Sequence, residues 1–146
     1  MPEEWLDWLA GTGAETAVFV SAFVSSTLMP GGSEVFLVGA LMQTPDDVDR
    51  IVRLLILATA GNTLGAMTSW AIGRLIPSRR TPGRAEVWLG RYGAPALLLS
   101  WLPVVGDALP LAAGWLRIPF AASLLWVMLG KGLRYLTVAG AALSIL

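Results

Sequence analysis

The chain has 146 residues, of which 55% are hydrophobic and 14% charged, and its formal net charge is zero. A typical soluble domain carries about 25% charged residues, so the composition favours one domain inside a membrane. Zero net charge gives no indication of a nucleic-acid partner. The absence of Cys and His excludes disulfides, the usual zinc and haem sites, and Ser–His or Cys–His catalytic pairs. We therefore expect a membrane protein with no metal, no cofactor and no enzymatic activity.

The first nine residues are acidic and lack the basic start of a signal peptide. They include Trp5, Leu6, Trp8 and Leu9, an amphipathic pattern that is typical of a short helix at the membrane interface. We expect such a helix before the first membrane segment.

Four apolar blocks follow, at about 14–44, 51–73, 92–116 and 118–146. The stretch Leu54–Gly73 alone holds 20 residues without a charge. About 20 apolar residues span a bilayer core of about 30 Å. The pattern predicts an all-α, multi-pass integral membrane protein, with residues 1–146 forming a single domain.

The first and third blocks are interrupted by proline and glycine. The first break contains Pro30, Gly31, Gly32, Ser33 and Glu34, and the second contains Pro103, Gly106 and Asp107. Proline inside a helix costs about 3 kcal/mol and glycine about 1 kcal/mol, so neither block is expected to be one straight helix.

The two breaks are spaced like parts of a repeat. The two prolines are 73 residues apart, as are the two acids, and 73 is half the chain length. The spacing predicts a first repeat at about 14–73 and a second at about 92–146, each a broken-helix hairpin followed by a transmembrane helix. Matching interruptions in two halves indicate a transporter binding site at the repeat interface.

The charges between the blocks predict the topology. The segment 74–91 has five Arg and one Glu, so we expect it to be a cytoplasmic linker. The segment 45–50 has three Asp and one Arg, which suits the opposite side. Re-entrant hairpins would give inverted repeats with both termini outside, whereas fully spanning blocks would put both termini inside. We favour hairpins, because non-helical backbone at membrane depth must be covered by protein or water.

Glu34 and Asp107 have two compatible interpretations. Each follows a break and opens the next half-helix, where an acid caps free N–H groups and meets the positive end of the helix dipole. Each could also carry protons across the membrane, because burial disfavours the charged form of a carboxyl group. We expect proton coupling in addition to capping.

Lys131 and Arg134 lie three residues apart near the middle of the last block. Thirteen uncharged residues precede them and twelve follow, so the alternative of snorkelling to the interface is difficult. With Glu34 and Asp107 they sum to zero charge, as a shared polar cavity requires. The guanidinium of Arg134 suits a phosphate, so we expect both bases to bind a head group.

Arg74 and Asn62 are further candidates for head-group binding. Arg74 ends the second block, where it would also anchor the topology. Asn62 lies between Gly61 and Gly65, which form a GxxxG pattern typical of close helix packing.

Several motifs together resemble a known family. They are Gly61–Arg74, Leu89–Gly93, Ser33–Val35, Arg91–Ala94, Ser100–Asp107, Ala113–Trp115, Gly130–Lys131 and Leu133–Tyr135. These motifs resemble the DedA family of bacterial membrane proteins, also called SNARE-associated Golgi or VTT-domain proteins, and in particular its short YqaA-like branch. The resemblance covers nearly the whole chain.

The resemblance implies two re-entrant hairpins and lipid translocation in the bacterial cytoplasmic (inner) membrane. Relatives move or scramble lipids, including undecaprenyl phosphate, and depend on the proton-motive force. Glu34 matches the family's first hairpin acid, and Arg74 matches the arginine that ends the following helix. Larger members have arginines where Ser100 and Gly106 stand here, and an acid where Ala66 stands, so their phosphate-binding residues do not transfer.

Three functions remain open on the sequence. We favour a flippase or scramblase that moves a phospholipid or polyprenyl phosphate with proton coupling, its partners being membrane lipid, protons and a possible second copy of the chain. A non-transporting membrane-organising subunit is one alternative. An intramembrane acid protease, with Glu34 and Asp107 as a carboxylate dyad, is the other.

Overall fold

The structure is a computed structural model that describes residues 12–27, 33–77, 82–102 and 105–145. These residues form helices and no strand. In chain order the helices are α2 (Thr12–Thr27), α3 (Ser33–Gln43), α4 (Val48–Leu75), α5 (Arg84–Tyr92), the 3₁₀ helix η1 (Ala94–Trp101), α6 (Val105–Trp115) and α7 (Phe120–Ile145). The all-α prediction is confirmed for this part of the chain. The expected helix at 1–9 and the break residues Pro30, Gly31, Gly32 and Pro103 lie outside the described residues.

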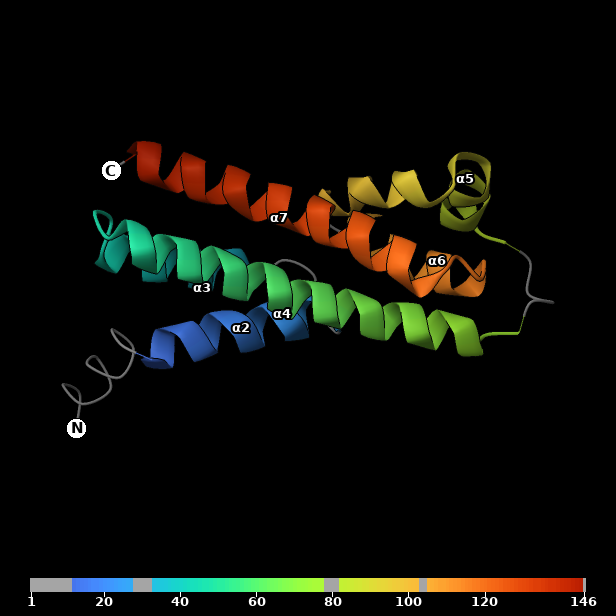
Figure 1. The fold of residues 1–146 in the computed structure, drawn as a ribbon, viewed down its shortest axis with the longest axis horizontal. Coiled ribbons are helices and arrows are strands. Elements are labelled where there is room, and N and C mark those ends of the chain that lie inside the picture. The colour runs from blue at the N-terminus through green and yellow to red at the C-terminus, as the bar shows by residue number, and fades with distance from the viewer. Residues whose placement is uncertain (1–11, 28–32, 78–81, 103–104, 146) are drawn as a thin grey trace.

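Two long helices form the axis of the molecule, and shorter ones cover each end. In Figure 1, α2 and α3 lie at the end where α7 finishes, and α5, η1 and α6 lie at the opposite end. The 28 residues of α4 and the 26 of α7 correspond to helices about 42 and 39 Å long. The 11 residues of α3 and of α6 correspond to about 16 Å each. Among these four helices, only the two long ones, α4 and α7, can therefore extend from one end of the bundle to the other.

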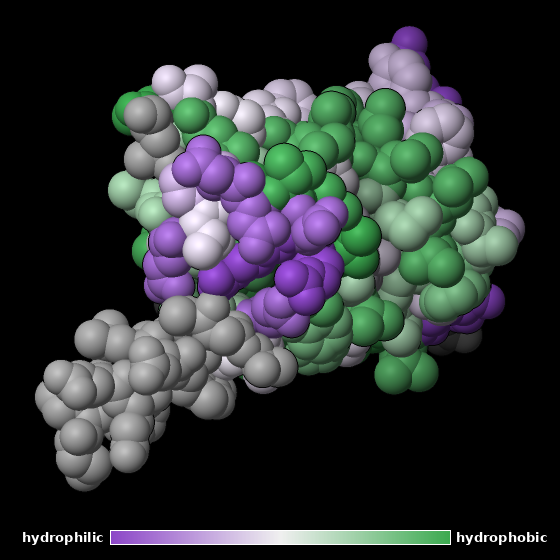
Figure 2. Space-filling view, turned by 60° about the vertical axis from the view of Figure 1, so that its left-hand side comes forward, coloured by the Kyte–Doolittle hydropathy of each residue, from purple (hydrophilic) through white to green (hydrophobic). Residues whose placement is uncertain are grey.

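Of the described helices, α4 is the one that is both long and apolar enough to cross a membrane. Lys131 and Arg134 interrupt the apolar sequence of α7. Figure 2 shows hydrophilic residues gathered at one end of the molecule, next to hydrophobic flanks. The turn between α3 and α4 contributes the exposed residues Asp46 and Asp47 at that end, and the first turn of α4 contributes the exposed Asp49. In this view the hydrophobic surface thus lies beside the hydrophilic end.

Glycines let the short helices pack closely on α4. A side-chain carbon on Gly65 would lie 2.6 Å from the carbonyl oxygen of Phe23 in α2, and one on Gly61 would collide with the carbonyl of Phe19. The Gly61/Gly65 pair is therefore a packing face, as its spacing predicts. At the other end of α4, a side-chain carbon on Gly73 would collide with the Leu111 carbonyl of α6. These contacts hold α2 and α6 against the same long helix.

The linker 74–91 is not wholly irregular, because it contains most of α5. The predictions from the sequence include no helix there. Glu86 and Leu89 are buried while Arg84, Val87 and Arg91 are exposed, so the helix buries one face. The alternation of apolar and charged residues at helical spacing in this segment could have predicted α5.

Candidate functional site

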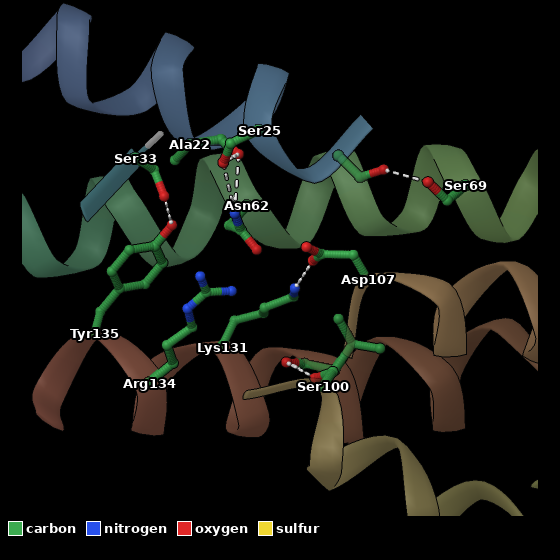
Figure 3. Close-up of polar contacts among 12 residues, drawn as sticks. Ala22, Ser25, Ser33, Asn62, Ser69, Ser100, Asp107, Lys131, Arg134 and Tyr135 are labelled. Atoms are coloured by element: carbon green, nitrogen blue, oxygen red, sulfur yellow. Dashed lines mark hydrogen bonds and ion pairs between the residues drawn. The ribbon is translucent and has the colours of Figure 1, made fainter. Parts of the chain in front are cut away.

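Two acid–base pairs lie inside the helix bundle. The Nζ of Lys131 donates to Oδ1 of Asp107 at 2.5 Å, and the guanidinium of Arg134 pairs with the carboxylate of Glu34. The side chain of Lys131 is fully buried, and those of Asp107 and Arg134 are 16% and 11% exposed. Figure 3 shows Lys131 and Arg134 reaching from α7 toward α4. The structure thus brings together the four charges that the sequence analysis singled out.

Each acid opens a half-length helix. Glu34 lies in the first turn of α3 and Asp107 in the first turn of α6. Their carboxylates therefore meet the positive ends of two helix dipoles as well as the bases of α7. Each acid pairs with a different base, so the site consists of two separate ion pairs. Both bases belong to α7.

Small residues bring α6 and α7 close enough for the Lys131–Asp107 pair. A side-chain carbon on Gly106 would collide with the backbone of Ser100 at the end of η1. One on Gly130 would lie 2.5 Å from Oγ of Ser100 and 2.6 Å from the carbonyl oxygen of Leu98. Ser100 Oγ itself donates to the Val127 carbonyl at 3.4 Å. The first turn of α6 and the middle of α7 are therefore both packed on η1.

A hydrogen bond between hydroxyl groups joins α3 to α7. Ser33 Oγ and Tyr135 Oη are 2.8 Å apart, and both residues are buried. The sequence predictions include Ser33 as part of a break and of a family motif, and they include Tyr135 only within the motif Leu133–Tyr135. Tyr135 lies one turn after Lys131 on the same helix face, so the helical period was a usable signal for it.

Asn62 of α4 connects the centre to α2. Its Nδ2 donates to the Ala22 carbonyl at 3.0 Å and to Ser25 Oγ at 3.4 Å, as Figure 3 shows. Its Oδ1 is buried and has no hydrogen-bond partner among the described residues, and the same is true of Thr63 Oγ1. A buried polar atom without a partner is costly, so these atoms are candidates to contact water or a ligand.

Arg74 does not join the central charges. It ends α4, twelve residues after Asn62, which is about 18 Å along the helix. Its guanidinium carbon lies 4.8 Å from the centre of the Trp70 ring. The structure therefore places Arg74 at the end of the bundle, whereas Asn62 lies near its middle.

An apolar groove runs between α4 and α7. It has a volume of about 620 Å³. Residues of α4 and of α7 line it, namely Val52, Leu55, Ile56, Thr59, Ala60, Thr63 and Leu64, with Met128, Gly132 and Leu136. Thr63 follows Asn62 in the chain and Gly132 follows Lys131, but none of the four central charged side chains is among the residues that line the groove.

Curated bacterial proteins are similar to the chain over most of its length. Inner membrane protein YqaA of Escherichia coli (strain K12) is 46% identical over 131 residues, which is 88% of this chain and 90% of that protein. The protein of the same name from Shigella flexneri has the same identity and coverage. An uncharacterized protein of Haemophilus influenzae is 46% identical over 127 residues, 81% of this chain and 80% of that one. No family model matches the chain, and no solved structure matches it. At this identity and coverage, the chain belongs to the family of inner membrane protein YqaA.

Proposed function

We propose that the chain is a multi-pass protein of the bacterial inner membrane that moves an anionic lipid across the bilayer with proton coupling. The observation that carries the proposal is the double ion pair, in which α7 supplies Lys131 and Arg134 to acids from two short helices. A charge at the centre of a membrane helix costs roughly 2.5–3.5 kcal/mol on insertion scales and usually marks a functional site.

We further propose that the chain is built from two inverted repeats. The helices α4 and α7 are longer than a hydrocarbon core of about 30 Å, whereas α3 and α6 reach about half of it. The pairs α2–α3 and η1–α6 would then be re-entrant hairpins that enter from opposite sides. With the basic segment 74–91 in the cytoplasm, the end of α7 lies outside. Labelling of a tag on the C-terminus in intact cells tests this topology, and a cytoplasmic C-terminus would contradict it.

The charges of the site suggest how lipid movement and proton movement could be coupled. In the described arrangement, both bases are neutralised by carboxylates. Protonation of Glu34 or Asp107 frees its base, and a phosphate head group can take the place of the carboxylate with no change in total charge. The positive ends of α3 and α6 would also favour that phosphate. When the lipid is released on the other side, the proton leaves the carboxyl group on that side and the carboxylate pairs with its base again.

The groove between α4 and α7 fits the hydrocarbon part of such a substrate. Exposed apolar residues on its walls include Ile56 and Leu136, which are 61% and 60% exposed. In a bilayer these residues would meet lipid chains. A lipid could thus keep its chain in the groove while its head group enters the polar centre beside Gly132 and Thr63.

The resemblance to the DedA family supports a lipid substrate, and the buried positions explain where this chain departs from the larger members. Ser100 is fully buried, and Gly106 packs directly on its backbone. Neither position has room for the arginine found there in larger members. Lys131 and Arg134 would supply the positive charge instead.

A transport assay with matched variants tests the carboxylate mechanism. Purified protein is reconstituted in proteoliposomes, and the exposure of a fluorescent phospholipid on the outer leaflet is followed. We expect Glu34→Gln and Asp107→Asn to lose most of the activity, and Asp49→Asn, which removes an exposed acid from the start of α4, to keep it. Unchanged rates in both carboxylate variants would remove the mechanism. No transport by the purified wild-type chain would favour a membrane-organising subunit.

A further inference from the structure

Helix α5 presents a basic and aromatic face that the proposed transport does not use. Arg84, Val87 and Arg91 are exposed and Trp88 is half-buried. These positions recur every three or four residues, so they share one side of the helix. On the opposite side, α5 packs on α6 and η1. The basic side therefore faces outward.

A hollow of about 360 Å³ lies on this face. Arg84 and Arg91 both line it, together with the rings of Trp88 and Tyr92. The centres of these two rings are 5.2 Å apart, and the guanidinium carbon of Arg91 lies 5.6 Å from the centre of the Tyr92 ring. Two guanidinium groups thus line one hollow together with two aromatic rings, each of which carries a polar group.

The acid of this helix, Glu86, lies on a different side of α5 from the two arginines of the hollow. Glu86 is 8% exposed and is turned toward the start of the helix, where its Oε2 would be 2.8 Å from a side-chain carbon on Gly83. It lies about 200° around the helix from Arg84, on the buried side. No other acid lies in the described segment 82–102. The exposed face of α5 is consequently positive.

We propose that this hollow binds the phosphate group of an anionic lipid at the cytoplasmic surface of the membrane. The planar guanidinium group offers paired donors that match phosphate oxygens. Trp and Tyr are favoured at the level of lipid head groups. Arginines near a membrane surface are attracted to anionic lipids by about 1 kcal/mol each. The site is separate from the central ion pairs and does not require transport.

Binding to the purified full-length chain in a neutral detergent tests the proposal by calorimetric titration. The probes are dioctanoyl phosphatidylglycerol, dioctanoyl phosphatidylcholine and inorganic phosphate. We expect phosphatidylglycerol to bind, and the double variant Arg84→Gln/Arg91→Gln to weaken it roughly thirtyfold. The control Arg53→Gln/Arg117→Gln removes the same charge from two other exposed positions and should change the affinity less than twofold.

The same titration distinguishes two sources of the phosphate group, a lipid head group and a free phosphate ion. Binding of phosphatidylglycerol with no binding of inorganic phosphate identifies a lipid head group. Equal binding of both, lost together in the double variant, identifies a free phosphate ion. The proposal is overturned if the double variant binds phosphatidylglycerol like the wild type, or if the control variant loses as much. Equally tight binding of phosphatidylcholine would also overturn it.

Discussion

Removing the acid of the Lys131–Asp107 pair should destabilise the protein strongly. In Asp107→Asn the fully buried ammonium of Lys131 loses the carboxylate that lies 2.5 Å from it. Leaving one partner of a buried ion pair uncompensated costs about 3–5 kcal/mol. For a chain of about this size, that corresponds to a fall in Tm of roughly 6–20 °C. Thermal unfolding of the purified protein in detergent, followed by circular dichroism, measures it.

The double variant Asp107→Asn/Lys131→Met is the matched control for this prediction. It removes the uncompensated charge, so its Tm should recover to within a few degrees of the wild type, because a well-packed apolar replacement of a buried pair is often neutral or stabilising. The two single variants and the double variant form a cycle that isolates the coupling between the two side chains. A single variant as stable as the wild type, or a double variant no more stable than Asp107→Asn, would refute the reasoning.

Three further predictions follow from contacts of the described residues. Tyr135→Phe leaves Ser33 Oγ without its 2.8 Å partner and should lower the free energy of unfolding by about 1–3 kcal/mol, measured by denaturant titration; no change would contradict the hydrogen bond. Gly114→Ala places a side-chain carbon against the backbone of α4 and should lower Tm, whereas Gly140→Ala, which meets nothing within 4 Å, should not; equal Tm values would argue against the close helix contact. Gly132→Leu partly fills the α4–α7 groove and should slow lipid exposure in proteoliposomes, while Gly140→Leu should not; equal rates in the two variants would exclude the groove from the lipid path.

The local features of the fold follow from the sequence. The first break predicts the end of one helix and the start of another, and α3 begins at Ser33. The second break likewise separates η1 from α6, which begins at Val105. The apolar blocks 51–73 and 118–146 correspond to α4 and α7 within a few residues. Helix propensity and apolar length act locally, which is why these elements could be predicted.

The partners within the site could not be assigned in this way. That Asp107 meets Lys131, and Glu34 meets Arg134, depends on packing between segments far apart in the chain. For the Asp107–Lys131 pair, this packing relies on Gly106 and Gly130, whose small size lets α6 and α7 approach Ser100. The 3₁₀ form of η1 could not be predicted either. Its sequence is as apolar as that of an α-helix, so hydropathy does not distinguish the two. The positions of the four charges in the apolar blocks therefore predicted a shared cavity, but they did not predict which acid pairs with which base.

The most direct test of the central claim is lipid movement driven by a pH gradient. Proteoliposomes containing the wild-type chain are prepared with and without a pH difference across the bilayer, and the distribution of a fluorescent anionic phospholipid between leaflets is measured by quenching. Proton-coupled lipid transport requires that the gradient change this distribution in the wild type and have no effect in the double variant Glu34→Gln/Asp107→Asn. The same distribution in the wild type with and without the gradient would contradict proton-coupled lipid transport.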